Sequence, residues 1–191
     1  MVDIEVNINS ISDDYYYNIE QIVKRKNLKL SNNKFKQNFF LEIENILIEI
    51  LTENRAKSNY KDIIKHQKKN IFSSPLIPDI TIKDYLERIK KYTKIDDNSI
   101  IMGLIYLDKF CNKTQIILTD YNIHRLLFTS LLIALRFGED VFYKNTFYSQ
   151  VCGVKTKILN KMEYEFACGI EFEFYVSLSI FNKFKININS D

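Results

Sequence analysis

Apolar residues recur every three or four positions over most of this chain, the spacing that places them on one face of an α-helix. Residues 34–53 show this spacing first and predict an amphipathic helix. Five further helices are predicted between Thr81 and Gly169, and a last apolar segment, residues 174–184, is expected to pack back as a helix. The pattern therefore predicts an all-α protein.

Capping residues mark where several of these helices begin. Thr81 with Asp84 three residues later forms an N-cap pair, and Asp96 offers a second cap. Asn145 is the candidate cap of a short helix over residues 146–152. The helix predicted for residues 120–137 is apolar on nearly every side, so we expect it to form the buried centre of a five-helix bundle.

Changes in composition divide the chain into four segments. Residues 1–33 are acidic and polar and form an arm, for which disorder is one interpretation. Residues 34–73 are interpreted as an N-terminal helix and a basic connector, residues 74–184 as the main domain, and residues 185–191 as a tail. Prolines soon after residue 73 mark the start of the main domain, because proline restricts the residue before it.

Composition and charge are consistent with this organisation. The chain has 191 residues, of which 46% are apolar, and only 4 glycines and 2 prolines, which favours helices around one core of ordinary size. The net charge is only +3, but basic residues gather between Glu53 and Lys69. This stretch is either a solvated face, the commoner case, or a surface for an acidic partner.

Several classes of function find no support in the residues. The three cysteines lack metal-binding spacing, which indicates reduced, buried thiols and a cytoplasmic or nuclear protein, and no window is long and apolar enough for a membrane span. No phosphate-binding glycine loop, metal pattern or nucleophile beside a base accompanies Asp108 and Asp140. His124 is interpreted as a capping or packing residue. We therefore predict no enzyme, no cofactor and no metal site.

Four segments together resemble the cyclin box of single-box P/U-type cyclins, the branch associated with phosphate signalling. In chain order they read TIKDYLERIKKY, IIMGLIYLDKF, NIHRLLFTSLLIALRFGED and YSQVCGVKTKILNKMEYEF. The resemblance covers residues 74–184 and coincides with the predicted helices. It implies a cyclin box, a five-helix bundle around a central hydrophobic helix, with an additional helix on each side.

The resemblance implies a partner and a site. Cyclins bind a cyclin-dependent protein kinase and activate it by holding its C-helix inward, and kinase substrates or inhibitors are further possible partners. The residues that match the kinase-binding pattern are a clamp of one basic and one acidic residue with four apolar neighbours: Arg136, Glu163, Ile133, Ala167, Phe172 and Phe174. The alternative for Arg136 and Glu163 is an ordinary surface ion pair within the chain. Arg136 stands where the family usually has lysine, and Ala167 where a larger apolar residue is common, so the choice of kinase stays open.

Two alternatives use the same helical box. One is a cyclin-like scaffold that binds a partner other than a kinase. The other is a nucleic-acid-binding module like the transcription-initiation factors related to TFIIB, which would favour two repeats, a zinc ribbon and a broad basic surface. This sequence offers only the short basic stretch after Glu53, so nucleic-acid binding is the weaker interpretation.

Overall fold

The computed structural model describes residues 39–139 and 142–188, which form eight α-helices and contain no β-strand. The all-α prediction is confirmed. The helices are α2 (Phe39–Arg55), α3 (Tyr60–Gln67), α4 (Ile82–Thr93), α5 (Asp97–Thr114), α6 (Ile123–Gly138), α7 (Asn145–Cys152), α8 (Thr156–Gly169) and α9 (Leu178–Ile188). Within the part of the chain that the structure describes, no helix combines the length and apolar character that a membrane crossing requires.

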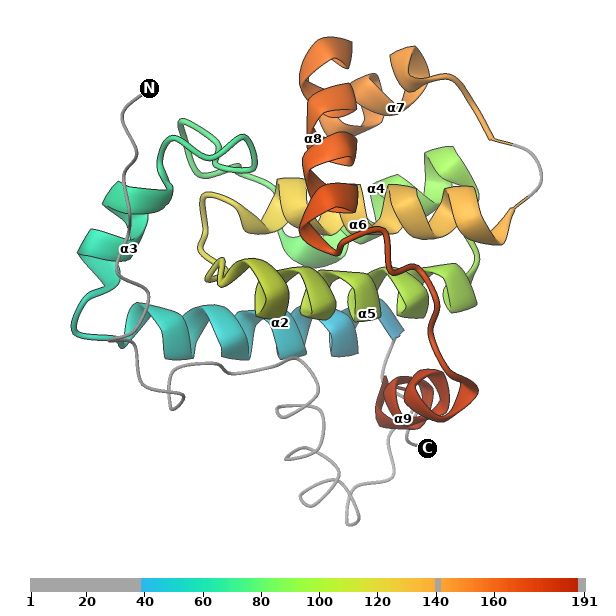
Figure 1. The fold of residues 1–191 in the computed structure, drawn as a ribbon, viewed down its shortest axis with the longest axis horizontal. Helices are drawn as coiled ribbons and strands as arrows, with labels where there is room; N and C mark the ends of the chain where they lie inside the picture. The colour runs from blue at the N-terminus through green and yellow to red at the C-terminus, as the bar shows by residue number, and fades with distance from the viewer. Residues whose placement is uncertain (1–38, 140–141, 189–191) are drawn as a thin grey trace.

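Helix α6 is the centre of the bundle, as its sequence predicts. It contacts α4, α5 and α8, and its apolar side chains from Ile123 to Leu135 are buried, Leu126 and Leu127 completely. Phe137, near its end, is exposed. Helices α5 and α6 run antiparallel across Figure 1, and α8 stands steeply to both. Gly103 of α5 allows the closest approach, because a Cβ atom at this position would lie 2.7 Å from Leu131 Cδ2 and 3.0 Å from its Cα.

The predicted caps of α4 and α5 are confirmed. Thr81 Oγ1 accepts a hydrogen bond of 3.0 Å from the Asp84 amide, and Asp96 Oδ1 accepts one of 2.5 Å from the Ser99 amide. Each cap satisfies an amide that has no partner inside its own helix. These two helix starts are therefore determined by local sequence.

Helix α6 begins three residues later than predicted, at Ile123. The Asn122 side chain accepts a hydrogen bond of 2.7 Å from the Thr119 amide and donates one of 2.9 Å to the Ile117 carbonyl, which closes a turn before the helix. Asp120 forms an ion pair with Arg55 instead of entering the helix.

Helix α3 lies in the segment predicted as a basic connector. None of its residues is fully buried, and its apolar stripe is short, formed by the half-buried Tyr60, Ile63 and Ile64. Its position is fixed at its start, where Tyr60 donates a hydrogen bond of 3.3 Å to the Asp120 carboxylate that also binds Arg55. The lysines Lys61, Lys65, Lys68 and Lys69 are exposed.

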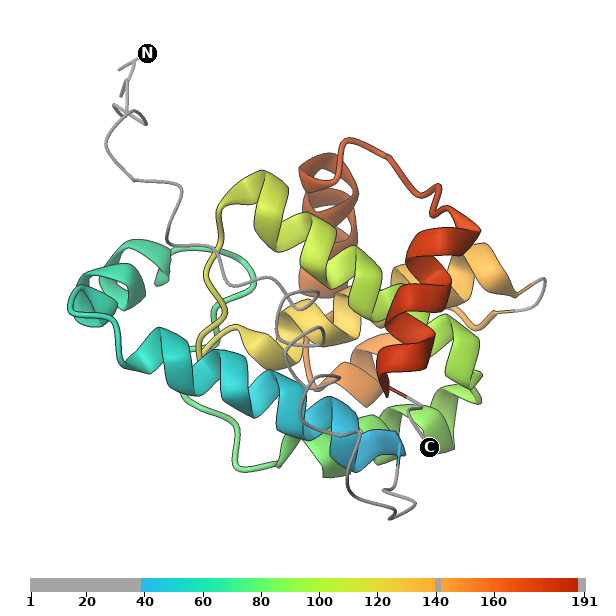
Figure 2. The same ribbon diagram turned by 90° about the horizontal axis from the view of Figure 1, so that it is seen from below.

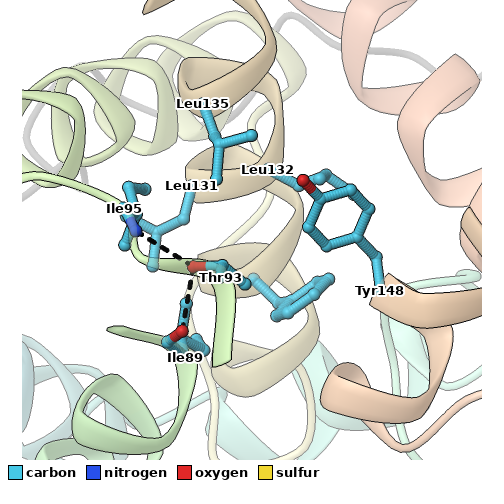
Figure 3. A pocket seen from close by; sticks show the side chains of 8 residues that line it. Ile89, Thr93, Ile95, Leu131, Leu132, Leu135 and Tyr148 are labelled. Carbon is cyan, nitrogen blue, oxygen red and sulfur yellow. Dashed lines mark hydrogen bonds between the residues drawn. The ribbon is translucent and has the colours of Figure 1, made fainter. Parts of the chain in front are cut away.

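The core is tightly filled where α4, α6 and α7 meet. A small gap of about 10 Å³ remains there between apolar side chains that include Leu132 and Tyr148 (Figure 3). A gap of this size holds at most one water molecule. Thr93 on its wall donates a hydrogen bond of 2.9 Å to the Ile89 carbonyl and so leaves no polar group facing the gap. The space is a packing defect and not a ligand site.

The C-terminal segment differs in detail from the prediction of a helix over residues 174–184. Residues 170–172 form a turn and residues 173–177 have no regular secondary structure. Helix α9 begins at Leu178 and crosses α5, as Figure 2 shows. Phe184 anchors α9 and is 2% exposed. The predicted arm, the first five residues of the helix predicted from residue 34, the end of the tail and Asp140 lie outside the described residues.

Candidate functional site

Arg136 and Glu163 form an ion pair between the end of α6 and the middle of α8. The distance from Arg136 Nε to Glu163 Oε1 is 2.6 Å, and the two side chains are 25% and 16% exposed. The two residues that the cyclin pattern singles out are 27 positions apart in the chain, so the fold brings them together. Both side chains stay partly exposed at the surface.

Asn145 links the two charged groups. Its side-chain oxygen accepts from Arg136 Nη2, and its side-chain nitrogen donates to Glu163 Oε2 and, over 2.8 Å, to Asn160 Oδ1. The sequence predicted Asn145 as a helix cap, which is wrong: α7 begins at Asn145 itself, Lys144 is at the capping position, and the Asn145 side chain makes tertiary contacts. This residue therefore belongs to the site.

Aromatic rings hold the guanidinium group of Arg136 in place. Its Cζ atom lies 4.9 Å from the centre of the Phe142 ring and 5.7 Å from that of Tyr148. Burial raises the pKa of Tyr148, so this ring stays neutral beside the cation. Stacking on aromatic faces suits arginine better than lysine because the guanidinium group is planar. The surroundings thus fit the arginine at this position.

A second cluster of rings lies beside the ion pair. Phe137 follows Arg136 and is 60% exposed; it stacks on Phe174 with ring centres 4.1 Å apart and planes inclined by 28°. Phe172, also 60% exposed, meets Phe174 edge to face at 6.2 Å. We call Phe137, Phe172 and Phe174 the aromatic cluster. It joins the end of α6 to the segment that follows α8.

The turn that carries Phe172 has an unusual backbone. Glu171 and Phe172 have φ angles of 55° and 57°, in the left-handed region that residues other than glycine rarely adopt. The Phe172 amide donates a hydrogen bond of 2.8 Å to the carbonyl of Ala167, and the Glu171 amide donates one of 2.8 Å to that of Cys168. These bonds close the end of α8 and direct Phe172 away from it.

Helix α5 contacts this turn through three polar side chains. Tyr106 donates a hydrogen bond of 2.8 Å to the Phe174 carbonyl, and Lys109 donates one of 2.8 Å to the carbonyl of Glu173. Lys113 lies 2.8 Å from a Glu171 carboxylate oxygen and 3.0 Å from one of Glu173. Its hydrogen bonds raise the pKa of Lys113 and lower that of Glu173, so both groups are charged near neutral pH.

The other predicted site residues are placed differently. Ile133 is only 4% exposed and belongs to the core beneath the surface, so it offers almost no area of its own. Ala167 is half-buried and acts through its carbonyl, which binds the Phe172 amide. Ile133 and Ala167 therefore support the surface that Arg136, Glu163 and the aromatic cluster present.

Sequence reasoning missed Phe137, Phe142 and Asn145. The sequence position of Phe137 could have indicated its role, because it directly follows the basic residue at the end of the central helix. The apolar residues earlier in that helix fill the core. Phe142 and Asn145 had none, since their contacts with Arg136 depend on how α7 returns to α6.

Other candidate residues have structural contacts. His124 Nε2 lies 3.0 Å from the Ile80 carbonyl, and Arg125 Nη1 donates hydrogen bonds of 2.9 and 3.0 Å to the carbonyls of Ile71 and Ser73. Both side chains therefore bind the backbone of residues 71–80, which precede α4, in agreement with the interpretation of His124 as a packing residue. Among the residues that the structure describes, no group of histidine, cysteine and carboxylate side chains is arranged to hold a metal ion.

Comparisons with known proteins agree with this fold. The sequence profile of the cyclin family matches residues 43–174. The chain is 35% identical to Cyclin-U4-1 of Arabidopsis thaliana over 138 residues, which are 70% of this chain and 68% of that protein. It is 40% identical to Cyclin-U2-1 of the same plant over 120 residues, 61% of this chain and 53% of the relative.

A P-type cyclin is also similar. The chain is 29% identical to Cyclin-P3-1 of Oryza sativa subsp. japonica over 142 residues, 72% of this chain and 60% of that protein. The matches span little more than half the length of several of these relatives. The alternative of a transcription-initiation factor receives no support from these comparisons. The profile match and the similarity to both U-type and P-type relatives place this chain in the cyclin family, among the P/U-type cyclins.

Proposed function

We propose that this chain is a regulatory subunit that binds a cyclin-dependent serine/threonine protein kinase and activates it, without catalysing a reaction itself. The kinase needs the ion pair between the lysine of its third strand and the glutamate of its C-helix before phosphoryl transfer is efficient. A partner that binds only the helix-in state shifts the population of kinase molecules toward that state.

The observation that carries the proposal is the position of the Arg136–Glu163 ion pair beside exposed aromatic rings. Polar groups for recognising a helix backbone and apolar area for binding energy lie on one surface. A phenylalanine side chain that is 60% exposed can still bury about 100 Å² in a complex, worth roughly 2.5 kcal/mol per ring before the costs of association. Phe137 and Phe172 both meet this condition.

Each residue has a proposed role at the kinase C-helix. Arg136 donates to backbone carbonyls, and Glu163 accepts from backbone amides or from a side chain of the kinase. Phe172 and Phe174 contact apolar side chains of the kinase helix together with Phe137. Ile133 and Ala167 complete the surface from below, which fits their low exposure.

The experiment uses a charge exchange. The chain is purified, cyclin-dependent kinases that it captures from its own cells are identified, and each is produced alone and tested for phosphorylation of a peptide with and without the chain. The double variant Arg136→Glu with Glu163→Lys can keep an internal ion pair but presents the opposite polarity to the kinase. We expect it to stay folded, with a lower unfolding temperature because a carboxylate at position 136 loses the cation–ring contacts with Phe142 and Tyr148, and to lose activation.

The outcomes separate structure from docking. Activation by the wild-type chain and not by the exchanged variant supports the proposal. A wild-type chain that captures no cyclin-dependent kinase, or whose exchanged variant binds a captured kinase equally well, contradicts it. In the second case the ion pair would serve only to connect α6 with α8.

A further inference from the structure

The turn after α8 is held by charges that lie outside the proposed docking surface. Lys113, near the end of α5, contacts the carboxylates of Glu171 and Glu173 on either side of Phe172, at 2.8 and 3.0 Å. Lys109, one helical turn earlier, donates to the Glu173 carbonyl at 2.8 Å and lies 3.8 Å from its carboxylate. The charged groups of Lys109, Lys113, Glu171 and Glu173 therefore lie around the left-handed turn at Glu171 and Phe172.

That backbone is strained. Two consecutive residues, neither of them glycine, adopt the left-handed conformation, in which the Cβ atom crowds the following carbonyl oxygen. Such conformations persist only where the surroundings determine them, and they concentrate at functional sites. Hydrogen bonds from the Glu171 and Phe172 amides to α8 hold the turn from one side, and the lysines of α5 contact it from the other.

We propose that Lys113, with Glu171 and Glu173, forms an electrostatic clamp that holds the left-handed turn and thereby positions Phe172 and Phe174 for the kinase. The residues of the clamp are positioning residues: they act through the backbone of the turn and need no contact with the kinase. This inference rests on the proposed function, because it concerns the same surface.

The clamp has a measurable effect on affinity. If only a fraction of the molecules has the turn in the binding conformation, the apparent Kd rises by the inverse of that fraction. The clamp is largely exposed and its ion pairs are individually weak, so we expect Lys113→Met to raise the Kd about threefold to tenfold. Lys113→Arg keeps the cation and is expected to stay within about twofold of the wild type.

A glycine substitution distinguishes positioning from direct contact. Glu171→Gly removes a carboxylate but adds the one residue that adopts positive φ without strain. If Lys113 acts by holding the turn, Glu171→Gly in the Lys113→Met background should return the Kd to within about twofold of the wild type. If Lys113 or Glu171 instead touches the kinase, the double variant should bind no better than Lys113→Met.

The experiment measures each variant twice. Hydrogen exchange of the amides of residues 171–174, all of which donate hydrogen bonds, is followed in the chain without kinase. The Kd is then measured with the kinase that the wild-type chain activates. In Lys113→Met we expect a faster rate of amide exchange and a higher Kd than in the wild type, with the same unfolding temperature. In the double variant Lys113→Met with Glu171→Gly, we expect both the exchange rate and the Kd to fall below those of Lys113→Met.

Two results overturn the clamp. One is that Lys113→Met has the same rate of amide exchange and the same Kd as the wild type. The other is a raised Kd that glycine at position 171 does not lower. If Lys113→Met unfolds, Glu173→Gln gives the same test with one ion pair retained. Failure of the wild-type chain to bind any kinase would contradict the proposed function and the docking role together, whereas the first two results contradict the clamp alone.

Discussion

Replacing Glu163 by lysine is the most direct test of the candidate site. In the folded chain the Glu163 carboxylate contacts Arg136 at 2.6 Å and accepts from Asn145. The substitution removes both contacts and places a second cation next to the guanidinium group. Glu165→Lys is a matched control, because it makes the same change of charge on the same helix at an exposed position.

The cost in stability follows from the burial of the pair. Removing one partner costs about 0 to 1 kcal/mol in an exposed ion pair and about 3 to 5 kcal/mol in a buried one. The Arg136–Glu163 pair is partly buried, so removing Glu163 should lower the free energy of unfolding by about 2 kcal/mol. Two like charges about 4 Å apart repel by up to about 4 kcal/mol at an effective dielectric constant of 20, but the new lysine can turn toward solvent. We expect a total loss of about 2 to 4 kcal/mol.

This loss leaves the chain folded, because domains of this size unfold with about 5 to 15 kcal/mol. Tm should fall by about 5 to 15 °C in Glu163→Lys and by about 2 °C or less in Glu165→Lys. Truncating one member of an interfacial charge contact costs about 2 to 5 kcal/mol, so the Kd for the kinase should rise at least about thirtyfold.

Calorimetry of unfolding and titration with the activated kinase measure the two effects separately. A Tm that falls while the Kd stays the same would refute the placement of Glu163 in the docking surface. An equal rise in Kd for Glu165→Lys would show that net charge alone, and not the ion pair, governs binding.

Three further predictions concern packing, pH and the linking amide. Gly103→Ala should lose about 1 to 2 kcal/mol in urea unfolding, because the new Cβ would lie 2.7 Å from Leu131 Cδ2. Burial lowers the pKa of His124, so at mildly acidic pH the unfolded chain binds a proton that the folded chain does not. The free energy of unfolding should therefore decline as the pH falls below about 6.5. In urea titrations His124→Gln should reduce this decline, whereas His66→Gln, at an exposed position, should not. Asn145→Ala should lower stability by about 1 to 2 kcal/mol and weaken kinase binding about tenfold in a direct titration, by freeing both charged groups.

Features with local causes could be predicted from the sequence. Thr81 and Asp96 cap their helices through hydrogen bonds to amides three residues away, and a sequence displays that spacing directly. The central position of α6 followed from the apolar residues around its whole circumference. The pairing of Arg136 with Glu163 needed the cyclin resemblance, because no periodicity connects residues on two separate helices.

Features with distant causes could not be predicted. Helix α3 has only a short, half-buried apolar stripe, and its start is held by Asp120, which lies 60 positions from Tyr60. Asp120 was in turn predicted as the first residue of α6, but its carboxylate binds Arg55. Asn145 looked like a cap because asparagine often is one, whereas its side chain here satisfies two charged groups. In each case a tertiary contact overrides a local preference.

The contacts of Phe137 explain why the charged and aromatic parts of the site are positioned together. Arg136 and Phe137 are neighbours on α6, so one helix end directs both side chains. Arg136 is tied to α8 by Glu163, while Phe137 is tied through Phe174 to the segment that follows α8. Any shift of α8 against α6 would therefore disturb both contacts at once. Phe137 and Phe172 both expose apolar area beside Phe174, which is the area that the proposed kinase would cover. We therefore expect the proposed docking surface to be most sensitive to substitution at the end of α6, from which Arg136 contacts α8 and Phe137 contacts the segment that follows α8.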